Sequence, residues 1–288
     1  KPKVISCTFD KKYLNIPKEI ITITMQHHQR YFPLFDQHGT LTNFFLVVAN
    51  LPDKKKYIKI GNEKVIKARL SDASFFWEKN KKQNLIKQVG KLKALSLFDQ
   101  LGSLYDKTQR LRKSGSFLSD HLNFNKEKIE IAASLCKADL TSDLVNEYPE
   151  LQGVMGKYFA EAQGFGEEIS LAISDHYLPT STKGTIPKKP VSCVVAIADK
   201  VDTLVGFFGI NEKPTSSKDP FALRRSAIGL LRIIIENNIT IRLKDIINYS
   251  TILYSEQNIK LKNKQITSEF LNFLKDSTKN TLKEKKIR

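Results

Sequence analysis

The hydrophobic pattern of the chain changes near residue 58, and the two patterns predict different secondary structure. Before that point, short runs of β-branched and aromatic residues at 4–9 and 44–49 predict β-strands. The polar segment 36–39 lies between two apolar runs and ends in glycine, which predicts a hairpin turn. Pro17 predicts the start of a short helix, because proline is tolerated in the first helical turn. The first part of the chain is therefore expected to be mixed α/β.

After this point the apolar positions recur at helical spacing, as they do at Leu85 and Val89. Residues 98–210 are predicted to be almost wholly helical, with one continuous helix over about 127–146. The polar segment 179–184 is predicted to be a loop between these helices. The second pattern therefore predicts a long all-α region.

A further helix is predicted after the proline- and serine-rich segment 214–220. Asp219 is a residue type that is favoured at the N-cap of a helix, and Pro220 is favoured at the first helical position. The helix is therefore expected to begin at Pro220 and to run to Ile235.

The expected fold class is α+β and predominantly helical, because one mixed segment is followed by a long helical one. Three parts are predicted: a mixed α/β module at 1–72, an all-α domain at 73–212, and the start of a further helical domain at 213–288. Hydrophobic residues make up 41% of the 288-residue chain, enough for a sizeable core. No apolar run reaches the roughly 20 residues of a membrane span, so no membrane partner is expected. The chain opens on Lys1 without an initiator methionine, so it is expected to be a trimmed chain or a piece of a longer protein.

The charge balance is strongly basic: 47 Lys and Arg against 30 Asp and Glu give a formal net charge of +17. Such a charge favours a polyanionic partner, most often a nucleic acid. The alternative is a composition that is rich in lysine for genomic reasons and implies no partner. The three cysteines lie far apart, which is typical of a reducing, cytoplasmic setting and not of a disulfide framework or a zinc site.

Three clusters of cationic and polar residues are candidate nucleic-acid contacts. The first lies in the segment 25–32, where histidine and arginine stand beside aromatic residues of the kind that stack on bases. The second follows Gly61 and the third lies around the segment 214–225, both with cations suited to phosphate. The candidates are His28, Arg30, Lys64, Lys67, Arg69, Lys218, Arg224 and Arg225. Each cluster has an alternative explanation. The first would be an ordinary polar strand edge, the second a solvated helix face, and the third an ion pair at a domain junction.

Two acidic residues are predicted to point inward. Asp139 falls on the apolar side of the helix expected over 127–146, and Asp199 follows the apolar run 194–198. A buried carboxylate needs a cation or strong hydrogen-bond donors, so a metal ion, a lysine or an arginine is expected nearby. The chain has no phosphate-binding loop of the G-x-x-x-x-G-K-[ST] kind, so ATP binding by this chain is not predicted.

Several of these segments together resemble one known family. They are Met25-Gln26-His27-His28-Gln29-Arg30-Tyr31-Phe32, followed in order by 61–73, 137–140, 147–156, 176–179, 198–204 and 214–225. From about residue 20 to 235 the chain resembles the β subunit of the bacterial two-subunit (α2β2) glycyl-tRNA synthetase. Ser216 stands where that family usually has glycine, which stiffens the backbone there.

The resemblance implies a function and a division of labour between subunits. The β subunit of that family binds and positions tRNA(Gly), while the α subunit makes glycyl-adenylate from glycine and ATP with Mg²⁺. The implied partners are therefore the α subunit and tRNA(Gly), and neither a catalytic residue nor a cofactor is expected in this chain. In the family a further module precedes these segments and an anticodon-binding region follows them. The chain is thus expected to match the middle of the subunit.

The middle part of the family resembles the HD phosphohydrolase fold, in which histidines and aspartates hold one or two metal ions. The resemblance places Lys107 where the first histidine would be, and Ala138 where the histidine of the His-Asp pair would be. Asp139 and Asp199 persist, and His176 is a further candidate ligand. Two ligands are missing, so neither a metal ion nor hydrolysis is expected. We expect the Lys107 ammonium to take the cation's place beside Asp139, Asp199 or both.

Two other functions stay open at this point. One is an active metal-dependent phosphohydrolase of the HD type, against which the residues at 107 and 138 argue. The other is a structural scaffold for the α subunit that touches no RNA. Metal analysis with a nucleotide-hydrolysis assay tests the first, and the salt dependence of tRNA binding tests the second.

Overall fold

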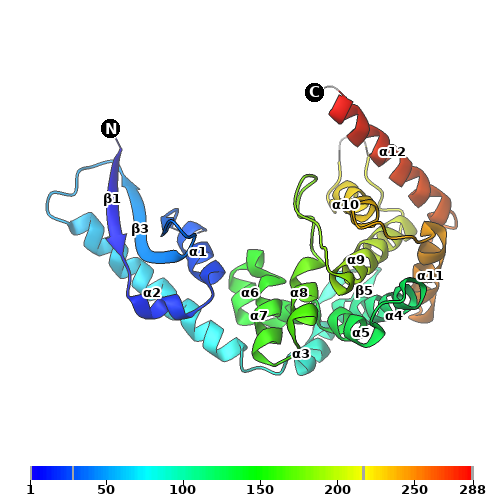
Figure 1. The fold of residues 1–288 in the computed structure, drawn as a ribbon, viewed down its shortest axis with the longest axis horizontal. Coiled ribbons are helices and arrows are strands. Elements are labelled where there is room, and N and C mark those ends of the chain that lie inside the picture. Colours follow the sequence, from blue (N-terminus) through cyan, green and yellow to red (C-terminus); the bar gives the residue numbers. More distant parts are fainter. Residues whose placement is uncertain (1, 28, 216–217, 287–288) are drawn as a thin grey trace. The chain divides into compact units, whose positions relative to one another are not determined.

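The computed structural model describes residues 2–27, 29–215 and 218–286. Within them the chain is predominantly helical with a small amount of β-sheet, which confirms the expected α+β class (Figure 1). The chain divides into two compact units. The first unit comprises the residues up to Gln83 with Ser142–Gln152, and the second comprises Asn84–Thr141 and the residues from Gly153 onward. The three-part division at 72 and 212 stays a prediction, because compactness alone does not identify domains that fold independently.

The first unit contains an antiparallel sheet of three strands in the order β1-β3-β2. Its strands are β1 (Lys3–Thr8), β2 (Phe32–Phe35) and β3 (Leu41–Ala49). The β2–β3 hairpin confirms the turn predicted at 36–39, where the Asp36 carboxylate accepts the N–H groups of His38 and Thr40. Gly39 takes the left-handed conformation at φ +76° that such a turn requires.

Helices pack on this sheet. They are η1 (Lys11–Asn15), α1 (Lys18–Gln26) and α2 (Tyr57–Asn80), where η denotes a 3₁₀ helix. Two short helices complete the unit: α6 (Asp143–Glu147) packs on α2, and η4 (Pro149–Leu151) packs on α6 and α1. α1 follows Pro17 as predicted, and α2 has the helical pattern predicted from residue 58. Cys7 and Phe45 occupy paired positions of β1 and β3 and are fully buried, so the inner face of the sheet contributes to the core of the first unit.

The second unit is a bundle of helices with two short strands. Its helices are α3 (Leu85–Lys91), η2 (Leu92–Ala94), α4 (Leu104–Leu122), α5 (Lys126–Leu135), η3 (Ala138–Thr141), α7 (Val154–Ala162), α8 (Glu167–Asp175), α9 (Pro190–Gly209), α10 (Leu223–Glu236), α11 (Leu243–Glu256) and α12 (Ile266–Lys286). Its strands are β4 (Ser96–Phe98) and β5 (Gly102–Ser103), which pair with each other. The segment 179–184 is a loop, as predicted.

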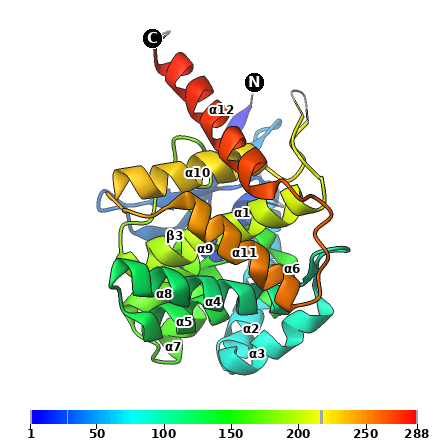
Figure 2. The same cartoon turned by 90° about the vertical axis from the view of Figure 1, so that its right-hand side faces the viewer.

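The centre of the second unit is α9. It is buried on nearly all sides, and α4, α5, α8, α10, α11 and α12 pack against it (Figure 2). Its long apolar run explains this position, because a helix that is apolar all round must be covered on every side. No helix among the described residues combines the length and the apolar composition that crossing a bilayer requires.

The continuous helix predicted over 127–146 is wrong. α5 ends at Leu135, η3 follows, and α6 begins after Ser142, whose hydroxyl accepts the N–H of Val145 as an N-cap. Asp139 lies in η3, where its carboxylate accepts backbone N–H groups at the start of α7. Capping by Ser142 and these longer-range hydrogen bonds outweigh the helical pattern of the segment.

The predicted start of the helix that follows the segment 214–220 is wrong by three residues. α10 begins at Leu223 and not at Pro220, because Ala222 takes a left-handed conformation at φ 52° just before the helix. Asp219 still caps the helix, since its carboxylate accepts the N–H groups of Leu223 and Arg224. The capping residue is therefore the predicted one, but it acts across a longer turn.

Candidate functional site

Two helices of the second unit face each other with opposite charges. α4 carries Lys107 and Arg110, and α9 carries Asp199 and Asp202, in each case three residues apart. Three of the four are almost fully buried, and the side chain of Asp199 is 14% exposed. Together with Lys137, which follows α5, they form what we call the buried charge network. Each charge in it needs its partner, because an unpaired buried charge costs several kcal/mol.

Arg110 and Asp202 form the most complete ion pair of the buried charge network. Arg110 Nε lies 2.6 Å from Asp202 Oδ1, and Nη2 lies 3.2 Å from Oδ2, so the pair is bidentate. The guanidinium also donates to Gln257 and lies 3.9 Å from the centre of the Tyr254 ring. Burial alone would lower the pKa of Arg110, but the Asp202 carboxylate outweighs it and holds that pKa above its ordinary value. One charged residue thus joins α4 to α9 and α11.

Two ammonium groups lie beside the Asp199 carboxylate. The Nζ atoms of Lys107 and Lys137 lie 3.2 and 3.3 Å from Asp199 Oδ1. Lys107 Nζ also lies 3.3 Å from Asp202 Oδ2 and donates to Thr203 Oγ1 at 2.7 Å. Burial alone would raise the pKa of Asp199, but the two lysines outweigh it and hold that pKa well below its ordinary value. The contact between Lys107 and Asp199 is one of the two pairings expected from the sequence.

Asp139 is held by backbone groups. It is 1% exposed, and its Oδ2 accepts the N–H groups of Gly153 and Gly156 at 2.6 and 3.1 Å. Burial raises the pKa of Asp139 to about 6, although these hydrogen bonds favour the charged form. A Cβ on Gly156 would lie 2.6 Å from Cγ2 of Ile173, so the close approach of this backbone depends on glycine.

Replacing Asp139 with asparagine is expected to change the pH dependence of stability. Between about pH 4 and 6 the unfolded chain releases the Asp139 proton while the folded chain keeps it, so the free energy of unfolding falls as the pH rises. For a pKa that rises from 3.8 to about 6, the loss is about 3 kcal/mol. Asparagine does not titrate, so the Asp139→Asn variant should gain most of this amount relative to the unchanged protein between pH 4 and 7. Urea denaturation at a series of pH values measures the gain.

The comparison with the variant is necessary because His176 has the opposite pH dependence. Burial and the Lys137 charge hold the pKa of His176 well below its ordinary 6.5. The unfolded chain therefore takes up a proton below pH 6.5, and stability falls as the pH falls. This contribution is present in both proteins and cancels in their difference. A difference in the free energy of unfolding that stays constant from pH 4 to 7 would show that the pKa of Asp139 is not raised.

The ring of His176 has a fixed orientation. It is fully buried and packs on Tyr177, with 3.9 Å between the ring centres. Its Nδ1–H donates to the carbonyl oxygen of Ile173 at 2.7 Å, so Nε2 is the nitrogen without a proton. Nε2 has no hydrogen-bond partner among the described residues. Lys200 donates to the backbone carbonyl of His176, and burial lowers the pKa of Lys200 to about 8.

The residues that the resemblance assigns to a degenerate metal site do not fit a metal ion. Ala138 is fully buried and has no donor atom, and Lys107 and Lys137 already neutralise Asp199. In the part of the chain that the structure describes, no group of three or more His, Cys, Asp or Glu side chains is arranged to hold a metal. The descent of this cluster from a metal site stays a prediction.

The candidate RNA contacts of the first unit lie on α2 and on the connection between α1 and β2. Lys64 and Lys67 are exposed on α2, and Arg69 is partly buried on the same helix. Arg30 is exposed in the connection with φ 53°. Within the described ranges, none of these cations forms an ion pair. His28 lies outside the described residues. The role of all five in RNA binding stays a prediction.

The candidate contacts of the second unit lie just before α10 and in its first turn. Lys218 and Arg225 are exposed, and neither forms an ion pair with any residue that the structure describes. Arg224 is partly buried, and its Nη2 donates to the carbonyl oxygen of Thr215 at 2.7 Å. Arg224 therefore holds the segment before α10 in place, while Arg225 keeps an available guanidinium. Their role in RNA binding also stays a prediction.

Sequence reasoning misses three members of the buried charge network: Arg110, Lys137 and Asp202. A signal for two of them exists, because Arg110 follows Lys107 and Asp202 follows Asp199 by three residues, on the same helix face. Opposite charges at equal spacing in two helices, one of which is as apolar as α9, indicate a buried pair of ion pairs. Lys137 has no such signal, since it lies between two helical elements.

The fold and these clusters define a basic, predominantly helical α+β protein. Its buried acids Asp199 and Asp202 are neutralised by its own lysines and arginine, and cations without ion pairs lie on the described surface. The sequence profile of the family described as "Glycyl-tRNA synthetase beta subunit" matches residues 1–288. The chain belongs to this family.

Individual relatives agree with the assignment, and each is named "Glycine–tRNA ligase beta subunit". The protein from Colwellia psychrerythraea is 42% identical over 274 residues, which cover 95% of this chain and 39% of the relative. The protein from Acinetobacter baumannii is 44% identical over 256 residues, or 88% of this chain and 37% of the relative. The protein from Paracidovorax citrulli is 38% identical over 287 residues, which cover 99% of this chain and 40% of the relative. The chain thus spans about two fifths of the length of these relatives.

Proposed function

We propose that this chain is the part of a glycine–tRNA ligase β subunit that binds tRNA(Gly) and positions it for glycylation. The family and the names of the relatives support the enzyme class, and the net charge of +17 supports an RNA partner. The α subunit carries the adenylation site and uses ATP with Mg²⁺, so this chain contributes no catalytic residue. The complex acts in the cytoplasm.

The observation that carries this proposal is that some exposed lysines and arginines form ion pairs with acidic side chains, while others do not. Some are already neutralised: Lys126 and Lys128 each lie 2.9 Å from an acidic side chain. Lys64, Lys67 and Arg225 are exposed and form no ion pair with the described residues. Exposed cations without acidic partners are available to phosphates, and phosphate contacts dominate the affinity of proteins for nucleic acids.

Removing the available cations is expected to weaken tRNA binding and its dependence on salt. The test measures the Kd of the complete α–β enzyme for a tRNA(Gly) transcript by filter binding, between about 50 and 200 mM salt. The Lys64→Ala/Lys67→Ala variant should lower the slope of log K against log salt by about 1 to 2, since each lysine contacts one phosphate. Lys126→Ala/Lys128→Ala removes the same number of charges and should leave the slope unchanged, because those lysines are already neutralised.

Two outcomes would count against the proposal. Affinity that does not depend on salt would favour a scaffold for the α subunit over an RNA-binding part. Equal effects of the two double variants would show that the pairing state of the lysines does not decide which of them reach the RNA.

A further inference from the structure

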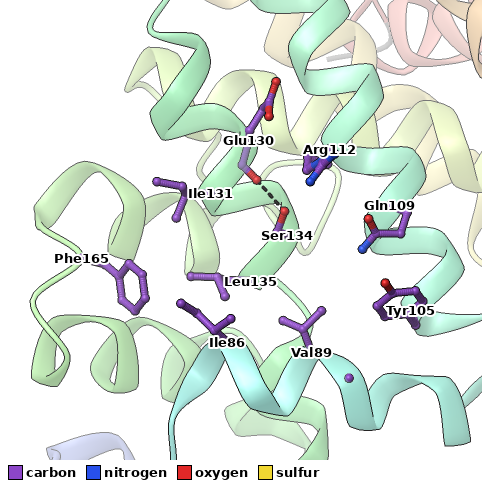
Figure 3. A pocket seen from close by; sticks show the side chains of 11 residues that line it. Ile86, Val89, Tyr105, Gln109, Arg112, Glu130, Ile131, Ser134, Leu135 and Phe165 are labelled. Carbon is purple, nitrogen blue, oxygen red and sulfur yellow. Dashed lines mark hydrogen bonds between the residues drawn. The ribbon is translucent and has the colours of Figure 1, made fainter.

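A cavity of about 590 Å³ opens on the second unit and shares no residue with the buried charge network. Its wall is formed by α3, α4, α5 and the turn between α7 and α8. Figure 3 shows Phe165 on one side of the opening and Tyr105 with Gln109 on the other. Val89 and Leu135, both largely buried, lie between them. The volume falls in the range of about 300–1,000 Å³ that is usual for small-ligand sites.

α4 supplies the polar wall of this cavity. Tyr105, Gln109 and Arg112 follow one another at spacings of four and three residues, so they share one face of the helix. Lys107 and Arg110 lie on another face and enter the buried charge network. The ion pairs that fix α4 against α9 therefore also fix the orientation of this wall.

The backbone of Phe165, on the opposite side of the cavity, is fixed by the turn between α7 and α8. The N–H of Phe165 donates to a carbonyl oxygen in the last turn of α7, and Gly164 beside it has φ +76°, which together make a Schellman helix end. The side chain of Gln163 accepts the N–H of Leu85 at 2.9 Å, which joins this turn to the start of α3. The backbone of Phe165 is thus in place before any ligand binds.

The polar side chains of the cavity are available to a ligand. Among the described residues, no side-chain hydrogen bond or ion pair engages Gln109, Arg112 or Glu130. Lys93 does not line the cavity, but its Nζ lies 4.9 Å from the centre of the Tyr105 ring, so a second cation lies beside this wall. Amide, carboxylate and guanidinium groups beside aromatic rings are the groups with which proteins recognise an unstacked base and its phosphate.

We propose that this cavity holds the base of one unpaired nucleotide of the bound RNA, an inference that rests on the RNA-binding function proposed above. The face of the base stacks on Phe165, and its polar edge meets Gln109 and Glu130. The nucleotide's phosphate meets Arg112 and Lys93, which outnumber the single acid of the wall. A base matches this mixed lining because it has an apolar face and a polar edge. An apolar side chain of a protein partner would leave the amide, guanidinium and carboxylate groups desolvated without partners.

Fluorescence of 2-aminopurine in RNA bound to the complete α–β enzyme tests the assignment. Each unpaired nucleotide of a tRNA(Gly) transcript is replaced in turn with 2-aminopurine, and the change in fluorescence on binding is recorded. One position is expected to respond with the unchanged protein. In the Phe165→Ala enzyme this position should no longer respond, and the affinity for the tRNA should fall roughly 5- to 150-fold. Phe165→Tyr keeps an aromatic ring and should retain both.

The matched control removes a ring outside the cavity. Phe75 is 63% exposed on α2, so Phe75→Ala deletes the same side chain without touching the cavity wall. This variant is expected to keep the response of the 2-aminopurine position that Phe165→Ala abolishes. Loss of that response in both variants would overturn the proposal.

The outcomes also separate the cavity from the function on which it rests. If tRNA binds with salt-dependent affinity but no 2-aminopurine position responds to Phe165→Ala, the cavity assignment is overturned and the RNA-binding function stands. If tRNA does not bind, the function fails and the cavity assignment falls with it. Photoreactive benzoylphenylalanine in place of Phe165 gives an independent readout. Crosslinks to the tRNA support the proposal, and crosslinks to the α subunit alone overturn it.

Discussion

Replacing Asp202 with alanine is expected to lower the free energy of unfolding of the second unit by about 3–5 kcal/mol. The Asp202 side chain is 1% exposed and lies 2.6 Å from Arg110 and 3.3 Å from Lys107. Without this carboxylate, Lys107 still forms its ion pair with Asp199. Arg110, however, stays buried with no acidic partner among the described residues. Amide hydrogen exchange of α4 and α9 in the intact subunit, measured at increasing urea, reports the loss.

Two further variants show whether the buried charge is the cause. Asp120→Ala breaks the exposed pair with Lys126 and should change stability by less than about 1 kcal/mol. The double variant Arg110→Met/Asp202→Leu removes both charges of the buried pair and should be more stable than Asp202→Ala, because no uncompensated guanidinium remains. If Asp202→Ala behaved like Asp120→Ala, the carboxylate would not be neutralising a buried cation.

Replacing Gly153 with alanine is expected to destabilise the same unit by about 2–5 kcal/mol. Gly153 has φ +78°, a conformation in which a Cβ costs about 1–2 kcal/mol. The added Cβ would also lie 2.7 Å from Cδ2 of Tyr177, and displacing that ring costs about 1–3 kcal/mol more. Because the N–H of Gly153 donates to Asp139, any shift of this backbone also weakens the support of a buried carboxylate. Hydrogen exchange of α7 and α8 measures the effect.

Gly164→Ala is the matched control for this prediction. Gly164 has nearly the same φ, +76°, but nothing lies within 4 Å of the Cβ that alanine would add. Its replacement should cost only the backbone strain of about 1–2 kcal/mol. Equal losses for the two variants would mean that the Tyr177 ring yields freely, and the predicted overpacking at Gly153 would then be wrong.

Local patterns were enough to predict the fold class and most of the elements. The hairpin at 36–39, the helix after Pro17 and the helices of the second unit follow from residues close together in the sequence. The order of the long motifs was enough to indicate the family, which the match over residues 1–288 confirms. The inward position of Asp199 also follows from local information, since it ends an apolar stretch of α9.

Only the tertiary structure decided which groups meet. Lys107 and Arg110 find their acids 92 to 95 residues later in the chain, and the donors to Asp139 are backbone amides that carry no side-chain signal. Phe165 likewise lines a cavity with α4, although nothing near it in the sequence indicates this. The physical reason is that periodicity shows which residues share a face of one element, but not which element covers that face. Where a capping residue and long-range hydrogen bonds compete with a helical pattern, as they do within 127–146, the folded contacts prevail.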